Sequence, residues 1–230
     1  MSGRGLYAPF RLLSEVIKMT TLVAPRKHVM TLYSGTVDPW SHRTRIVLYE
    51  KDIECQVVEV DPGKKPRELA DLNPYNELPT MVDRDLVLYG SHIINEYLDE
   101  RLPHPPLMPV DPVSRAKARL QLMRIDRDWY SLVPDLAGND KKGATKARNT
   151  LRDGLTVISP LFKEQPFILG AELSLVDCSL APILWRLDQY GVDLPRQAKP
   201  ITDYAERLFA RKSFRLSLTE AERALRGGKR

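Results

Sequence analysis

No hydrophobic run in this 230-residue chain is long enough to cross a bilayer, which takes about 18 apolar residues. The most apolar stretch, residues 167–187, is interrupted by the charged side chains of Glu172, Asp177 and Arg186. Residues 1–18 also lack the apolar block and the cleavage site of a signal peptide. We therefore expect a protein without membrane-spanning segments that works in the cytoplasm.

Cysteine is scarce, and only Cys55 and Cys178 occur. They lie far apart and form no C-x-x-C motif, so neither a redox pair nor a zinc site is indicated. The four histidines show no metal-ligand spacing with cysteines or carboxylates, and there is no phosphate loop or dinucleotide motif. We expect no metal, no cofactor, and two reduced cysteines in the core.

The net charge of +5 is unevenly distributed. Residues 1–29 carry five Lys or Arg and one Glu, and residues 210–230 carry seven Lys or Arg and two Glu, which leaves −4 for the residues between. This distribution favours solvated basic tails around a slightly acidic body over a DNA-binding arm. A basic face for phosphates is not indicated, so we expect no direct, specific DNA binding.

The first hundred residues predict a small α/β domain. Residues 1–28 have no steady period and are expected to form a flexible extension. Four short strands are expected, at residues 29–34, 55–60, 78–83 and 86–89. Helices are expected after Ser41, over residues 66–72 and after Ser91, with the two serines as caps. The resulting β-α-β-α-β-β-α order predicts one compact α/β domain over residues 29–102.

The rest of the chain is expected to be helical. Four prolines predict an extended linker over residues 103–111, and the pair Asp111-Pro112 is typical of a helix start. Helical patterns follow at residues 112–129, 144–162, 175–187, 201–211 and 214–226. The first of these helices carries Ala116, Leu120, Met123 and Trp129 near helical spacing. An all-helical domain is therefore predicted for residues 112–230.

Three motifs follow one another along the chain: residues 76–83 (NELPTMVD), residues 90–94 (GSHII) and residues 174–177 (SLVD). The third motif is a capping box at the start of a helix that is expected to be buried. With the domain order above, they resemble the glutathione-transferase fold, a thioredoxin-like domain followed by an all-helical one. The resemblance implies that Pro79 is cis and that Ser91 lies where a helix N-terminus holds the γ-glutamyl carboxylate.

Longer segments are similar to the stringent starvation protein A family. They are residues 38–46, 98–110, 128–130, 180–187 and 217–223. This resemblance implies a homodimer that binds RNA polymerase with its principal sigma factor and redirects transcription under stress. Residues 1–28 lie outside the match.

The resemblance places Asp38 where transferases of this fold with a C-P-x-S motif have their thiol. A carboxylate forms no mixed disulfide, and it raises the pKa of a neighbouring thiol. Tyr33, Ser34 and Ser41 are nearby substitutes, although a strand side chain is the favoured interpretation of Tyr33 and a helix cap that of Ser41. We therefore expect a vestigial glutathione cleft at Asp38, Pro79 and Ser91 without transferase activity. A glutathione-dependent transferase or thiol-handling enzyme is the alternative.

The residues expected to bind a partner are Pro103, His104, Pro105 and Pro106. Prolines on both sides stiffen the backbone of His104, and a rigid exposed segment loses little entropy on binding. A plain interdomain linker is the alternative. The resemblance favours binding, because this segment belongs to the family's functional surface.

Overall fold

The computed structural model describes residues 29–227, so the extension expected over residues 1–28 lies outside the described residues. The first part of the described chain has the predicted β-α-β-α-β-β-α order. Its elements are β1 (Met30–Gly35), α2 (Pro39–Glu50), β2 (Cys55–Val60), α3 (Arg67–Leu72), β3 (Thr80–Asp83), β4 (Leu86–Tyr89) and α4 (Ser91–Arg101). The strands form one sheet in the order β2-β1-β3-β4, in which β1 is parallel to β2 and antiparallel to β3.

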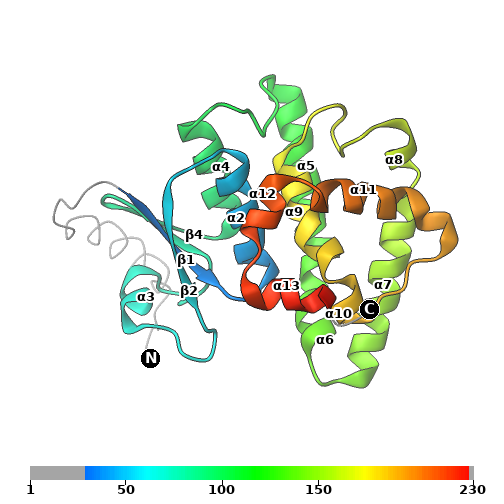
Figure 1. The fold of residues 1–230 in the computed structure, drawn as a ribbon, viewed down its shortest axis with the longest axis horizontal. Coiled ribbons are helices and arrows are strands. Elements are labelled where there is room, and N and C mark those ends of the chain that lie inside the picture. The colour runs from blue at the N-terminus through cyan, green and yellow to red at the C-terminus, as the bar shows by residue number, and fades with distance from the viewer. Residues whose placement is uncertain (1–28, 228–230) are drawn as a thin grey trace, which may run out of the picture.

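The second part is helical, as predicted, apart from one β-bridge between Phe167 and Gly170. Its elements are α5 (Pro112–Asp128), η2 (Tyr130–Leu132), α6 (Val133–Ala137), α7 (Lys141–Ile158), α8 (Leu161–Glu164), α9 (Leu175–Trp185), α10 (Leu187–Tyr190), η3 (Arg196–Ala198), α11 (Lys199–Phe209), α12 (Lys212–Ser217) and α13 (Glu220–Gly227). The sheet lies on one side of the molecule and the long helices on the other, with α12 and α13 between them (Figure 1). The thioredoxin-like and all-helical halves of the glutathione-transferase fold are thus confirmed.

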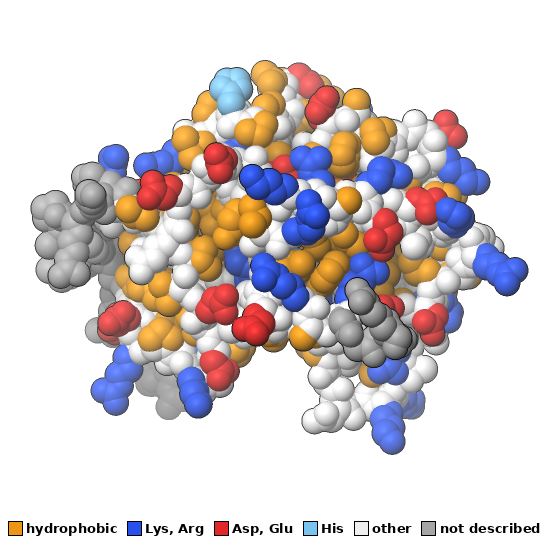
Figure 2. All heavy atoms as spheres, in the orientation of Figure 1, with side chains coloured by type: hydrophobic (Ala, Val, Ile, Leu, Met, Phe, Trp, Pro, Cys, Tyr) orange, Lys and Arg blue, Asp and Glu red, His pale blue; other side chains and the backbone are white. Residues whose placement is uncertain are grey.

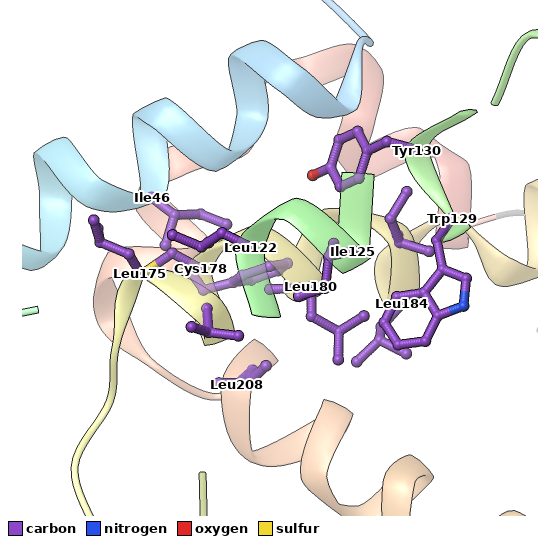
Figure 3. Packing of buried hydrophobic residues seen from close by; sticks show 14 of the residues in the cluster. Ile46, Leu122, Ile125, Trp129, Tyr130, Leu175, Cys178, Leu180, Leu184 and Leu208 are labelled. Atoms are coloured by element: carbon purple, nitrogen blue, oxygen red, sulfur yellow. The ribbon is translucent and has the colours of Figure 1, made fainter. Parts of the chain in front are cut away.

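Helix α9 lies at the centre of the helical half. All ten residues from Leu175 to Leu184 are buried. The predicted capping box is present, because Asp177 Oδ2 accepts a hydrogen bond from the Ser174 backbone N–H at 2.9 Å. Ile46 of α2 and Leu122 of α5 lie close to this helix (Figure 3). One hydrophobic core therefore continues from the sheet half into the helical half.

The buried face of α5 differs from the predicted one. Ala118, Leu122 and Ile125 are buried, whereas the predicted residues Ala116, Leu120 and Met123 are exposed. Trp129, which directly follows the helix, is buried. The helix carries two apolar stripes, and α9 covers only one of them. Spacing within the helix cannot distinguish the two stripes, because both repeat every three or four residues.

The C-terminal residues are part of the folded body, so the predicted solvated tail over residues 210–230 is wrong for the described part. The single helix expected at residues 214–226 is two helices, α12 and α13. They are separated at Thr219, which forms a second capping box with Glu222. Arg211 is also paired, since its Nε lies 2.6 Å from Glu50 Oε1. On the face of the molecule shown in Figure 2, Lys and Arg side chains are interspersed with those of Asp and Glu.

Residues 102–111, between α4 and α5, contain neither helix nor strand. The Leu78–Pro79 peptide bond is cis, as expected, and the His104–Pro105 bond is cis as well.

A membrane-spanning helix, which would have to be both long and strongly apolar, is absent from residues 29–227.

Candidate functional site

A cleft of about 530 Å³ lies between the sheet half and α5. Its walls come from the loop ahead of α2, from α2, from the loops ahead of α3 and β3, and from the N-terminus of α4 and α5. Asp38 and Ser91 line this cleft, whereas Pro79 is buried and is not among the lining residues. Two of the three residues predicted to mark a vestigial glutathione cleft are thus brought together.

Asp38 caps α2, so the prediction that Ser41 is the cap is wrong. The Asp38 carboxylate accepts a hydrogen bond through Oδ1 from the Ser41 backbone N–H at 2.7 Å, and Pro39 begins the helix. The Ser41 hydroxyl accepts instead from the Gly35 N–H at 2.9 Å. The residue at the expected thiol position therefore holds the start of the helix in place.

Ser91 does not cap α4, contrary to prediction. Gly90 occupies the N-cap position with a φ of 80°, which a glycine adopts without strain, and Ser91 is the first helical residue. The Ser91 hydroxyl accepts a hydrogen bond from Arg43 Nε at 2.7 Å. The hydroxyl expected to meet a substrate carboxylate thus contacts an arginine of α2.

Arg43 is almost completely buried, with 1% of its side chain exposed. Its Nη1 donates to Asp126 Oδ1 at 2.6 Å, and its guanidinium stacks 4.4 Å from the centre of the Tyr130 ring. Asp126 also accepts a hydrogen bond from His92. These contacts join α2, α4 and α5 across the cleft.

Asp126 balances the positive charge beside Ser91. Burial would raise the pKa of this carboxyl, but hydrogen bonds from His92 and Arg43 outweigh burial and lower the pKa below its usual value. Asp126 is therefore ionised near neutral pH and pairs with Arg43. The positive charge of Arg43 is thus balanced by a carboxylate of the protein itself.

Neither cysteine lines the cleft. Cys178 is buried, as predicted, and burial raises the pKa of its thiol well above the usual value. Cys55 is only half-buried, and burial raises the pKa of its thiol to about 11. Both thiols are therefore protonated at neutral pH, which makes them poor nucleophiles. Among residues 29–227, no group of three or more His, Cys, Asp or Glu side chains could hold a metal ion.

Glu222 lies at the centre of a buried cluster that fixes the loop ahead of α2. Its carboxylate accepts hydrogen bonds from Arg45 Nη2, at 2.6 Å, and from Arg186 Nη2. Arg186 also donates to the Val37 carbonyl at 3.0 Å. The loop that carries Asp38 is thus held by side chains from the helical half.

His42 lies in the same cluster and is neutral. Burial, followed by the positive charges of Arg186 and Arg45, lowers its pKa well below 6.5. Its Nδ1 lies 3.0 Å from Arg186 Nη1, and its Nε2 lies 3.1 Å from Ser217 Oγ. Because Arg186 can only donate, Nδ1 must accept, and Nε2 carries the proton.

The four residues predicted to bind a partner, Pro103, His104, Pro105 and Pro106, are all exposed and lie away from the cleft. Ser91 stands at one end of α4, and these residues follow the other end. The 11 residues of α4 separate the two sites by about 16 Å at 1.5 Å per residue. The next residues, Leu107 and Met108, are buried.

Sequence reasoning missed Arg43, His92 and Asp126 as parts of the cleft. Arg43 and Asp126 lie 83 residues apart, so no local spacing relates them. The only available signal was the adjacency of His92 to Ser91 at the start of α4.

Two protein-family models match the chain. The model for the glutathione S-transferase N-terminal domain matches residues 39–101, and that for the C-terminal domain matches residues 128–211. The crystal structure of glutathione transferase Omega 3C from Trametes versicolor is similar, with a TM-score of 0.73, 26% identity and 90% of each chain covered.

Curated relatives match at higher identity. A stringent starvation protein A homolog from Pasteurella multocida is 47% identical over 200 residues, covering 86% of this chain and 94% of the relative. A homolog from Coxiella burnetii is 45% identical over 202 residues, covering 87% and 97% respectively. On this evidence, the chain belongs to the stringent starvation protein A family and has the glutathione-transferase fold.

Proposed function

We propose that the protein is a cytoplasmic regulator of transcription in the stress or starvation response. It binds RNA polymerase holoenzyme and its principal sigma factor, and it binds no specific DNA sequence by itself. Relatives named for stringent starvation, at 45–47% identity over most of their length, support this assignment.

The observation that carries the proposal is that residues 103–106 are exposed and directly precede two buried residues, Leu107 and Met108. The three prolines and His104 are all exposed, so the segment offers apolar rings and one imidazole to a partner. Within this segment there is no Lys or Arg, so the surface suits a protein better than a phosphate backbone. Its neighbours Leu107 and Met108 are buried, which limits its freedom and the entropy lost on binding.

The cleft supports a binding role without glutathione chemistry. Ser91 is hydrogen-bonded to Arg43, Arg43 is neutralised by Asp126, and Asp38 stands at the expected thiol position. The alternative, a glutathione-dependent transferase or thiol-handling enzyme, is supported by the two transferase family models that match the chain. Retention on immobilised glutathione followed by conjugating activity would favour that alternative.

We further propose that the protein is a homodimer. Leu120 and Met123 of α5, together with Val113, form an exposed apolar stripe that α9 does not cover. A two-fold interface that includes this stripe would bury it against a second copy of the chain.

The test of the proposed function is a pull-down with immobilised full-length protein and purified RNA polymerase. The expected result is retention of holoenzyme above a blank resin. A parallel mobility-shift assay with plain DNA should show no sequence preference. Failure to retain holoenzyme, or specific binding to DNA without polymerase, would contradict the proposal.

A further inference from the structure

Lys51 directly follows α2, and its side chain is completely buried, with 0% exposed. A lysine is almost never fully buried without a partner. Its ammonium donates to Asp99 Oδ1 at 2.8 Å and to the backbone carbonyl of Pro105 at 2.7 Å. One buried cation thus connects the end of α2, helix α4 and the exposed proline segment.

Asp99 has a second contact with the same segment. The backbone N–H of Leu107 donates to its Oδ1 at 2.8 Å. The Leu107 carbonyl in turn accepts from the Leu175 N–H at the start of α9, also at 2.8 Å. The Lys51–Asp99 pair therefore holds the backbone on both sides of Pro106.

The proline segment cannot fix its own backbone conformation through regular hydrogen bonds. Pro103, Pro105 and Pro106 have no N–H group, so they cannot donate the hydrogen bonds of a helix or a sheet. Since the backbone groups of Pro105 and Leu107 are bonded to the side chains of Lys51 and Asp99, the local conformation depends on this pair.

The stability of the fold does not by itself require an ion pair here. Replacing a buried ion pair with well-packed apolar side chains is often neutral or stabilising. Apolar side chains would fill the same space, but they would leave the Pro105 carbonyl and the Leu107 N–H without these partners. The specific contribution of the pair is the geometry of the segment.

We propose that Lys51 and Asp99 are positioning residues for the partner-binding segment 103–106. They touch no partner themselves and act by holding the backbone of Pro105 and Leu107, so that His104 and the proline rings keep one arrangement. This inference rests on the proposed function of the segment. It adds two buried residues to a binding site that otherwise consists of exposed ones.

The main variant is Lys51→Met, which keeps the length and apolar stem of the side chain and removes the donor. Its matched control is Glu50→Gln. Glu50 is the preceding residue, is also largely buried at 8% exposed, and pairs with Arg211 rather than with the segment. Affinity for purified RNA polymerase holoenzyme and the melting temperature are measured for each full-length variant.

Lys51→Met leaves the Asp99 carboxylate buried without its cation, so this variant should melt at a lower temperature. The double variant Lys51→Met/Asp99→Asn removes that charge, and the asparagine oxygen still accepts from the Leu107 N–H. The double variant should regain much of the melting temperature. It should not regain affinity, because the Pro105 carbonyl still lacks its donor.

The expected result is about tenfold or more weaker binding for both Lys51 variants, and wild-type affinity for Glu50→Gln. A purely structural role would make affinity recover together with the melting temperature in the double variant, and that recovery would overturn the inference. A variant with Pro103, His104 and Pro105 all replaced by alanine separates the two proposals. If it loses binding while the double variant binds normally, only the role of Lys51 and Asp99 is wrong. If the triple-alanine variant binds normally, the assignment of the binding segment and the inference about Lys51 and Asp99 are both wrong.

Discussion

Arg43 donates a hydrogen bond from Nε to the Ser91 hydroxyl at 2.7 Å, inside a cleft that in transferases of this fold would hold glutathione. The same guanidinium pairs with Asp126. The Ser91 hydroxyl accepts from Arg43 and keeps its own hydrogen for donation, whereas the Arg43 charge beside it is already balanced by Asp126. A γ-glutamyl carboxylate at Ser91 would therefore meet no uncompensated positive charge from Arg43.

The protein should not conjugate glutathione to an electrophilic aromatic substrate above the uncatalysed rate. Asp38 supplies neither a thiol nor a group that lowers a thiol pKa, and the Arg43 charge beside Ser91 is balanced by Asp126. A spectrophotometric steady-state assay, with an active transferase as the positive control, measures this. Turnover comparable with that control would restore the enzyme alternative.

Glu222→Gln should lower the free energy of unfolding by about 3–5 kcal/mol, because Arg45 and Arg186 would remain buried without their counter-charge. Urea denaturation gives the value. Glu220→Gln is the matched control, since Glu220 is exposed on the same helix and its replacement should cost less than about 0.5 kcal/mol. Equal effects of the two changes would show that the buried cluster contributes little to stability.

His42 should make the protein less stable in acid. Its pKa is lowered in the folded state by burial and by Arg186 and Arg45, so below about pH 6.5 the unfolded chain binds a proton that the folded one does not. Stability is therefore unaffected above pH 6.5 and falls below it, by up to about 1.4 kcal/mol per pH unit. The nearby carboxylate of Glu222, 3.7 Å from Nδ1, does not reverse this direction.

His42→Gln tests the pH effect, because it removes the titrating group and keeps a donor and an acceptor. The free energy of unfolding is measured by urea denaturation between about pH 5.5 and about pH 7.5, the range in which histidine titrates. It should fall toward acid more steeply for the wild type than for the variant. Parallel curves would mean that His42 does not titrate between the folded and unfolded states in this range.

Leu120→Glu should convert the proposed dimer into monomers with little loss of folding. Leu120 is 51% exposed in the single chain, so the change leaves the core intact and places a charge in the proposed interface. Light scattering should give a mass near 26.3 kDa for the variant and twice that value for the wild type. Leu216→Glu, at a leucine of α12 that is 46% exposed, is the control that should stay dimeric. A wild-type protein of 26.3 kDa at micromolar concentration would contradict the dimer itself.

The fold could be predicted because its signals are local. Strand and helix periods, the proline-rich break and the Ser174/Asp177 capping box each lie within a few residues, and the structure has all four strands, the break and the capping box, although the helices expected at 144–162, 175–187 and 214–226 are each divided in two. The N-cap of α2 could also have been predicted from a local signal. The pair Asp111-Pro112 predicts the start of α5, and Asp38-Pro39 starts α2 in the same way.

The chemistry of the cleft could not be predicted in the same way, because its contacts are long-range. Arg43 meets Ser91 and Asp126 only after three helices pack together, and no sequence spacing encodes that meeting. Lys51 is a further example, since nothing local indicates that a lysine after a helix will be buried against Pro105. The exposed stripe of α5 shows the limit of periodicity, which finds apolar faces without telling which one the core covers.

The affinity of the combined Pro103→Ala, His104→Ala and Pro105→Ala variant for RNA polymerase holoenzyme tests the central claim most directly. Removing a compact exposed cluster at the centre of an interface costs about 2 kcal/mol or more, so binding should weaken at least about 30-fold. Pro134→Ala, at another exposed proline, should bind like the wild type. If the triple variant binds holoenzyme with wild-type affinity, the segment is not the contact with polymerase, and the account is wrong at its central point.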